Sequence, residues 1–138
     1  MNLLLLLIFS IVFLVLDVCW IQIFKHKFNP MIENIQNSPV VINMYGVIGA
    51  YLIMLIAYYN LAYNDDKPNY FKGILLGVAI YGTYEFTNYA TINKWHKSVM
   101  AIDIGWGICV SVLSLYITNL IYVYYKKNNQ SKNIFDTL

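Results

Sequence analysis

The sequence contains no arginine, and charged residues of any kind are scarce. Only 12% of its 138 residues are charged, whereas about a quarter of the residues are charged in an ordinary soluble domain. All nine basic residues are lysines, and they are spread over several segments of the chain. Because a nucleic-acid-binding surface needs a dense basic patch or stripe, we exclude nucleic acid as a partner.

Cysteine and histidine are equally rare, with two of each. Cys19 and Cys109 lie inside apolar segments, where a free cysteine behaves as a small hydrophobic residue, so we expect no disulfide between them. His26 and His96 stand in polar segments without the His-x-x-His or Glu-x-x-His spacing of a metal site. We therefore predict no metal site and no cofactor.

Hydrophobic residues make up 59% of the sequence, which is the composition of a membrane protein. A helix needs roughly 20 apolar residues to cross a hydrocarbon core about 30 Å thick. We expect four such spans, at 3–24, 41–62, 73–92 and 99–125. The predicted fold is all-α, an integral membrane four-helix antiparallel bundle. It forms one domain, 1–127, which is followed by a polar and flexible tail, 128–138. In the third span, Gly73 and Gly77 have the spacing that lets another helix approach closely.

Polar segments join the predicted spans. Between the first two, Pro30 and Pro39 should prevent a continuous helix, and the sequence Asn-Asp-Asp-Lys-Pro at 64–68 is typical of a turn. Helix alternation places the loops 25–40 and 93–98, each with two lysines and a histidine, at one end of the bundle, which we call the KH side. The opposite end carries five lysines and both termini, and this small excess favours a cytoplasmic location of the termini, in a cell membrane or, if the protein is viral, in a host membrane.

Three acidic residues interrupt the apolar segments. Asp17 lies two turns before the end of the first span, Glu85 just past the middle of the third, and Asp103 near the start of the fourth. Alternation puts all three in the KH half of the membrane, while the opposite half should have almost no buried polar groups. A carboxylate at the centre of a membrane helix costs about 2.5–3.5 kcal/mol on insertion scales, so such residues usually face the bundle interior and mark a functional site.

Helical spacing brings further side chains to the same faces. Asp17 and Trp20 are three residues apart, and the fourth span repeats this Asp-x-x-Trp spacing. In the third span, Tyr81, Glu85 and Asn88 fall on a single stripe. We therefore predict a ligand- or proton-binding site that is formed by Asp17, Trp20, Tyr81, Glu85, Asn88, Asp103 and Trp106.

Each acidic residue also has a purely structural explanation. Asp103 stands where the dipole of a helix N-terminus would stabilise a carboxylate. Asp17 could pair with Lys25 or Lys94, whose aliphatic stems can reach inward. A protonated Glu85 could bond to a neighbouring amide or hydroxyl group. Under these readings the acidic residues would only hold the bundle together.

The motifs around Glu85 and Asp103 are similar to those of a known protein family. Segment 81–91 reads Tyr-Gly-Thr-Tyr-Glu-Phe-Thr-Asn-Tyr-Ala-Thr and is followed by Trp95 and then, at 103–107, by Asp-Ile-Gly-Trp-Gly. With the Asp-x-x-Trp of the first span, this pattern resembles a family of small, predicted four-helix bacterial membrane proteins of unknown function. The signature there reads Tyr-Gly-Thr-Tyr-Asp-Leu-Thr-Asn-Leu-Ala-Thr, so this chain departs from it at Glu85. The resemblance spans essentially the whole chain and implies the same fold and candidate residues, but no activity, substrate or cofactor.

Three functions remain open from the sequence. In the first, which we prefer, the acidic site binds or transports a proton, a small cation or an amine solute. Four short helices are too few for a pore within one chain, so this function would require a homo-oligomer in the lipid bilayer. In the second, two carboxylates modify a lipid as acid and base, although phosphate recognition would have to rely on lysine. In the third, the protein is an accessory or structural one. No catalytic residue is assigned.

Overall fold

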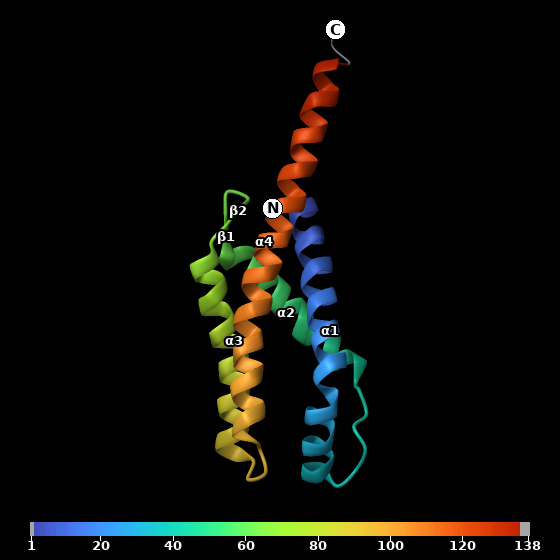
Figure 1. Cartoon of the computed structure of the whole chain (residues 1–138), viewed down its shortest axis with the longest axis vertical. Coiled ribbons are helices and arrows are strands. Elements are labelled where there is room, and N and C mark those ends of the chain that lie inside the picture. Colours follow the sequence, from blue (N-terminus) through green and yellow to red (C-terminus); the bar gives the residue numbers. More distant parts are fainter. Residues whose placement is uncertain (1, 136–138) are drawn as a thin grey trace.

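This computed structural model describes residues 2–135, of which 130–135 only as helical backbone. It is a bundle of four helices (Figure 1): α1 (Leu3–Gln36), α2 (Met44–Ala62), α3 (Tyr70–Thr91) and α4 (Lys97–Phe135). Consecutive helices run in opposite directions, and the start of α1 lies at the same end of the bundle as the last turns of α4. The predicted fold class is therefore confirmed.

Asparagine side chains begin three of the helices. Asn2, Asn43 and Asn69 are the N-caps of α1, α2 and α3, and each accepts a hydrogen bond from a backbone N–H in the first turn. Asparagine suits this position because its side-chain oxygen pairs a donor that the helix itself leaves unpaired. These caps explain why α2 begins at Met44, three residues later than predicted, and α3 at Tyr70, three residues earlier.

A short hairpin joins α2 to α3. Strands β1 (Tyr63–Asn64) and β2 (Lys67–Pro68) pair in antiparallel register around a two-residue turn. The turn residues Asp65 and Asp66 have φ angles of 49° and 62°, as a type I′ hairpin turn requires. The predicted turn at this position is confirmed.

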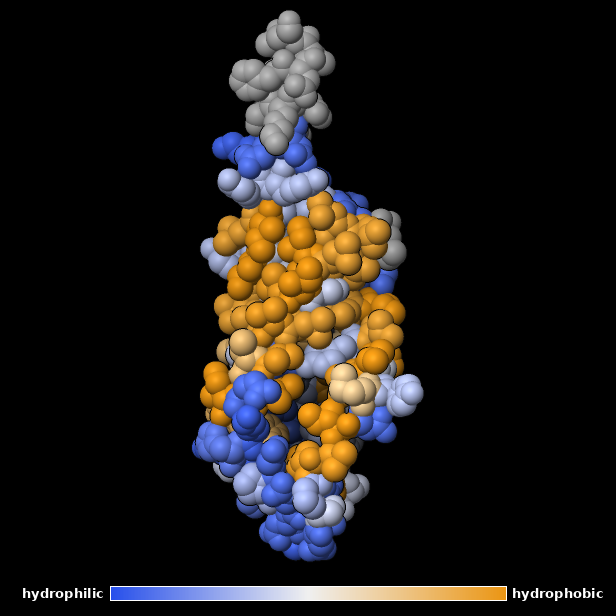
Figure 2. Space-filling view, turned by 90° about the vertical axis from the view of Figure 1, so that its right-hand side faces the viewer, coloured by the Kyte–Doolittle hydropathy of each residue, from blue (hydrophilic) through white to orange (hydrophobic). Residues whose placement is uncertain are grey.

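Three of the helices are long and apolar enough to cross a membrane, namely α1, α2 and the Lys97–Asn129 part of α4. Figure 2 shows the corresponding hydrophobic band over the middle and upper part of one face, with hydrophilic residues gathered at the lower end. Helix α3 is not among the three, because its glycine, threonine and asparagine residues and Glu85 reduce its hydropathy. A fourth crossing by α3 stays a prediction.

Two helices are longer than the sequence predicted. Helix α1 continues through Pro30, so the prediction of a loop from residue 25 was wrong over that stretch. The residue after the proline, Met31, is 2% exposed and packs against Trp95, and such packing offsets the cost of about 3 kcal/mol for a proline inside a helix. The predicted tail is helical as far as Phe135, and the last three residues lie outside the described part of the chain.

Helices α3 and α4 lie side by side along most of α3 (Figure 1). A Cβ atom added at Gly77 would lie 2.5 Å from the carbonyl oxygen of Gly107, and one added at Gly107 would overlap the ring of Tyr81. A Cβ atom at Gly73 would overlap a leucine side chain of α4. The predicted Gly-x-x-x-Gly contact is therefore present, and it fixes the height of Tyr81 and Glu85 against α4.

Candidate functional site

Asp17, on the inner face of α1, is the centre of a hydrogen-bond network. The residue is 6% exposed, and its carboxylate accepts hydrogen bonds from the Tyr51 hydroxyl at 2.5 Å, the Tyr81 hydroxyl at 2.9 Å and the Trp106 indole N–H at 2.8 Å. The three donors come from α2, α3 and α4, so one side chain ties all four helices together. A buried carboxylate needs such donors to replace water, and Asp17 has three.

Neither Lys25 nor Lys94 takes part in this network. Lys25 donates to the side chain of Gln22 at 2.8 Å, and Lys94 donates to the backbone carbonyl of Asn34 at 3.0 Å. The alternative that paired Asp17 with one of these lysines was therefore wrong. The sequence did hold a sign of one true partner of Asp17. Tyr51 stands in the middle of a predicted span, whereas tyrosines at a membrane interface stand at the ends of spans.

The two Asp-x-x-Trp motifs face each other and exchange partners. The Trp106 N–H donates to Asp17, and the Trp20 N–H donates to Asp103 at 3.3 Å. Between these bonds the two indole rings stack, with centroids 4.6 Å apart and planes at 6°. Because α1 and α4 are antiparallel, this exchange has local two-fold symmetry. The repeated motif thus joins the first helix to the last.

Glu85 lies beside the Asp103 carboxyl group. The Glu85 side chain is fully buried, and its Oε2 accepts a hydrogen bond of 2.6 Å from the indole N–H of Trp95. Oε1 of Glu85 has no hydrogen-bond partner among the described residues. The carboxyl group of Asp103, which is 8% exposed, is close enough to Glu85 for the charges of the two groups to interact. Two carboxyl groups can form a hydrogen bond only if one of them carries a proton.

Six of the seven predicted site residues belong to this connected cluster. The exception is Asn88, which is half-buried and lies next to Tyr84. Within the described part of the chain, its amide makes no hydrogen bond to Asp17 or Glu85. Trp95 was missed by the sequence reasoning, because it stands in the α3–α4 connection, where a tryptophan looks like an interface residue.

The opposite half of the bundle also contains buried polar residues, so the prediction that it has almost none was wrong. Ser111, Ser114 and Thr118 are fully buried on α4. The hydroxyl of Ser111 contacts that of Tyr58 and also donates to the carbonyl oxygen of Gly107. Small hydroxyl residues are easily overlooked in an apolar segment because they hardly change its hydropathy.

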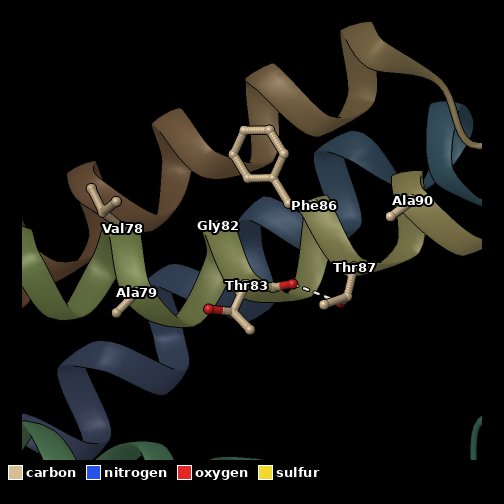
Figure 3. A pocket seen from close by; sticks show the side chains of 7 residues that line it. All are labelled: Val78, Ala79, Gly82, Thr83, Phe86, Thr87 and Ala90. Atoms are coloured by element: carbon tan, nitrogen blue, oxygen red, sulfur yellow. Dashed lines mark hydrogen bonds between the residues drawn. The ribbon is translucent and has the colours of Figure 1, made fainter.

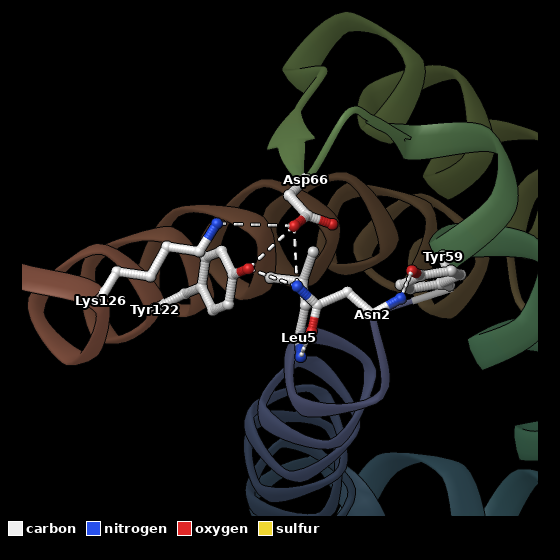
Figure 4. A network of polar contacts seen from close by, with 6 residues as sticks. All are labelled: Asn2, Leu5, Tyr59, Asp66, Tyr122 and Lys126. Carbon is white, nitrogen blue, oxygen red and sulfur yellow. Dashed lines mark hydrogen bonds and ion pairs between the residues drawn. The ribbon is translucent and has the colours of Figure 1, made fainter. Parts of the chain in front are cut away.

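A second polar network closes the end of the bundle opposite the KH side (Figure 4). Asp66 accepts hydrogen bonds from the Asn2 amide at 2.7 Å and the Tyr122 hydroxyl at 2.8 Å, and the Lys126 ammonium lies 3.7 Å away. The backbone N–H of Asn2 donates to the hydroxyl of Tyr59. The hydrogen bonds from Asn2 and Tyr122, and then the charge of Lys126, lower the pKa of Asp66. The network joins the start of α1 and the hairpin to α4.

A surface groove on α3 lies apart from the cluster. It has a volume of about 480 Å³, and Figure 3 shows its lining as a row of small and apolar side chains along one face of the helix. The lining residues are Val78, Ala79, Gly82, Thr83, Phe86, Thr87 and Ala90. None of them is titratable, and helical spacing places most of them on the side of α3 that faces away from Tyr81 and Glu85. We assign no ligand to this groove.

A family model matches residues 2–120, a range that includes the whole Asp17–Glu85–Asp103 cluster. The family is described as predicted membrane protein (DUF2177). The chain belongs to this family. Membership of DUF2177 agrees with the resemblance in the sequence and identifies a multi-pass membrane protein of unknown function. No curated protein and no solved structure matches the chain, and no group of three or more His, Cys, Asp or Glu residues in its described part could hold a metal.

Proposed function

We propose that this protein binds and exchanges a proton inside the membrane, at the Glu85–Asp103 carboxyl pair, as part of a transport function. The observation that supports this proposal is that Oε1 of the fully buried Glu85 has no hydrogen-bond partner among the described residues, while a second buried carboxyl group, that of Asp103, is close enough to interact with it electrostatically. A proton that two carboxyls share can leave when a neighbouring charge or the outside pH changes, and the pair then titrates as a unit.

Asp17 has a different role in this proposal. Its three donors match the lone pairs of an ionised carboxylate, so it positions the helices and needs no proton. The stacked indoles of Trp20 and Trp106 hold α1 against α4 and bring the Trp20 N–H to Asp103. The close contact of Gly77 with Gly107 sets the height of Glu85 against α4. Asp103 is six residues beyond Lys97, the first residue of α4, or about 9 Å along the helix axis. The pair therefore exchanges its proton with the KH side.

The pair also has the chemistry to hold a small cation or an amine. Such a ligand would replace the shared proton, because two ionised carboxylates attract a positive charge strongly in a low-dielectric site. Proton exchange is the better-supported function, since a proton on either of these two neighbouring buried carboxyl groups would give the unpaired Oε1 of Glu85 a hydrogen bond.

Infrared difference spectroscopy of the protein in lipid vesicles tests this proposal. In the wild type, a pH change from the KH side should alter the C=O stretching band of a buried protonated carboxyl. Glu85→Gln and Asp103→Asn should each abolish that band, because either amide can donate to the remaining carboxylate and remove the need for a proton. Glu33→Gln changes an exposed carboxyl and serves as the control that keeps the band.

The result that would contradict the proposal is equally clear. If the wild type shows no band of a buried protonated carboxyl at any pH at which the protein is folded, the two carboxyls do not share a proton. The same conclusion would follow if the band survived in both Glu85→Gln and Asp103→Asn.

A further inference from the structure

Buried hydroxyl groups continue from the acidic cluster toward the opposite end of the bundle. Ser111, Ser114 and Thr118 are each fully buried and follow one another at intervals of three and four residues, so they form a row on one face of α4. Tyr63, which is 9% exposed, lies at the far end of the row, with its hydroxyl next to that of Thr118.

The near end of this row reaches the Asp17 network. The hydroxyl of Tyr58 contacts Ser111 and is close enough to Asp17 and Tyr81 to interact with both electrostatically. Asp17, in turn, is close enough to Asp103 for the two carboxyl groups to interact electrostatically. Polar groups therefore follow one another from the Glu85–Asp103 pair to the hairpin.

The far end of the row lies near the second polar network. The ring centroids of Tyr63 and Tyr59 are 6.1 Å apart. The Tyr59 hydroxyl accepts a hydrogen bond from the backbone N–H of Asn2, and the side-chain amide of Asn2 donates to Asp66. Asp66 is about one-third exposed. A proton that reached this network would therefore be at the surface.

Packing alone does not explain the row. A serine or threonine hydroxyl inside a membrane helix is normally satisfied by the carbonyl one turn earlier, as Ser111 is by Gly107 at 2.5 Å. The hydroxyl of Ser114 has no hydrogen-bond partner in the described part of the chain, and those of Thr118 and Tyr63 lie next to each other without the geometry of a hydrogen bond. Alanine, valine and phenylalanine would fill nearly the same volume without leaving a buried hydroxyl unpaired.

We propose that this row is a route by which a proton passes between the acidic cluster and the end of the bundle that carries Asp66. The route rests on the proposed function, because the Glu85–Asp103 pair supplies the proton. At each step a hydroxyl oxygen takes up one proton and releases its own to the next group, so the hydroxyl is unchanged after it turns back. Where two hydroxyls of the row are one helical turn apart, the route requires a water molecule between them.

The titratable and charged groups along the route come from every packed element. They are Asp17 on α1, Tyr51, Tyr58 and Tyr59 on α2, Tyr63 and Asp66 on the hairpin, Tyr81 and Glu85 on α3, and Asp103, Tyr122 and Lys126 on α4. Of these, only Lys126 carries a positive charge, and it stands next to Asp66 at the surface. The groups named for the interior of the route therefore include no positive charge that would repel a proton.

Proton flux across vesicles tests the route. The full chain is reconstituted in vesicles of phosphatidylcholine and phosphatidylglycerol that enclose a pH-sensitive dye, and flux is driven by an imposed pH gradient. Ser114→Ala with Thr118→Val should reduce the flux about tenfold or more. The matched control is Ser10→Ala with Thr83→Val. It makes the same chemical changes at a serine of α1 whose hydroxyl donates to a backbone carbonyl of its own helix, and at an exposed threonine of α3. This control should leave the flux unchanged.

The outcomes separate the route from the proposed function. If the wild type shows the carboxyl infrared band but no flux, or if both double variants conduct equally, the route is wrong while the proton-sharing pair stands. If the band is missing too, both proposals fail. Should the double variant not fold, Thr118→Val is compared with Thr118→Ser, which keeps a hydroxyl. The route requires flux in Thr118→Ser and a loss of flux in Thr118→Val, and equal flux in the two would overturn it.

Discussion

Replacing Asp17 by alanine should loosen the packing of all four helices. The substitution removes the acceptor of three hydrogen bonds and leaves the donors of Tyr51, Tyr81 and Trp106 facing an apolar interior. Because each donor belongs to a different helix, no single movement of the backbone can satisfy all three. We therefore expect the cost to appear in the stability of the whole bundle.

The size of the effect follows from the number of bonds. Hydrogen bonds between membrane helices contribute about 0.6 kcal/mol on average and about 1.7 at most, so three of them amount to about 2–5 kcal/mol. Values for charged groups in soluble proteins would give a larger sum, about 5–9 kcal/mol. The membrane values apply here, because helices that have separated within the bilayer can find other partners.

Asp17→Asn is the matched control for this prediction. Its carbonyl oxygen can replace Oδ1, which accepts from both Tyr81 and Trp106, and its NH₂ group can donate to a reoriented Tyr51 hydroxyl in place of Oδ2. The expected cost of this variant is below about 1 kcal/mol. Unfolding in mixed micelles with increasing dodecyl sulfate, followed by tryptophan fluorescence, measures both variants. If alanine and asparagine cost the same, or if Asp17→Ala costs no more than Glu33→Ala at an exposed site, then Asp17 does not hold the bundle together.

Further predictions concern packing, the indole exchange and pH. Gly77→Ala should destabilise the α3–α4 contact by about 1–3 kcal/mol, whereas Gly49→Ala, where a Cβ atom meets nothing within 4 Å, should cost nothing in the same unfolding assay. Trp106→Phe keeps a stacked ring but loses the bond to Asp17, and it should cost at most about 1.7 kcal/mol; no loss would mean that the indole N–H is unimportant. Because the folded state lowers the pKa of Asp66, its stabilising effect is present above the pKa of the unfolded chain and is lost as the pH falls through the folded value. The melting temperature should therefore fall less on acidification in Asp66→Asn than in the wild type, and equal falls would contradict this.

Much of the fold could be predicted from two kinds of pattern in the sequence, the long apolar segments and the spacing of residues within them. The apolar segments predicted the helices and their order, and the Asp-x-x-Trp repeats predicted which faces of α1 and α4 meet. The close approach of another helix at Gly73 and Gly77 was also predicted, because few residue types allow it, and the structure identifies that helix as α4. In each case the residues of a single segment were enough to predict the feature, without knowledge of its partner in the fold.

Features that depend on tertiary partners could not be predicted in the same way. The continuation of α1 past Pro30 depends on the packing of Met31 against Trp95, which comes from the other side of the bundle. The role of Tyr51 depends on the depth at which α2 crosses α1. The partner of Glu85, Asp103, follows from the height of α3 against α4, which the glycine contacts set.

The shared proton can be tested most directly through the two glutamates of the chain. Glu33 and Glu85 are the only ones, so protein labelled with ¹³C-glutamate and reconstituted in lipid gives two side-chain carboxyl signals in solid-state NMR, and Glu33→Gln assigns them. At neutral pH the Glu85 signal should lie away from the position of an ionised carboxylate, and it should move to that position in Asp103→Asn, where the new amide donates to Oε1. A Glu85 signal at the ionised position in both proteins would contradict the shared proton.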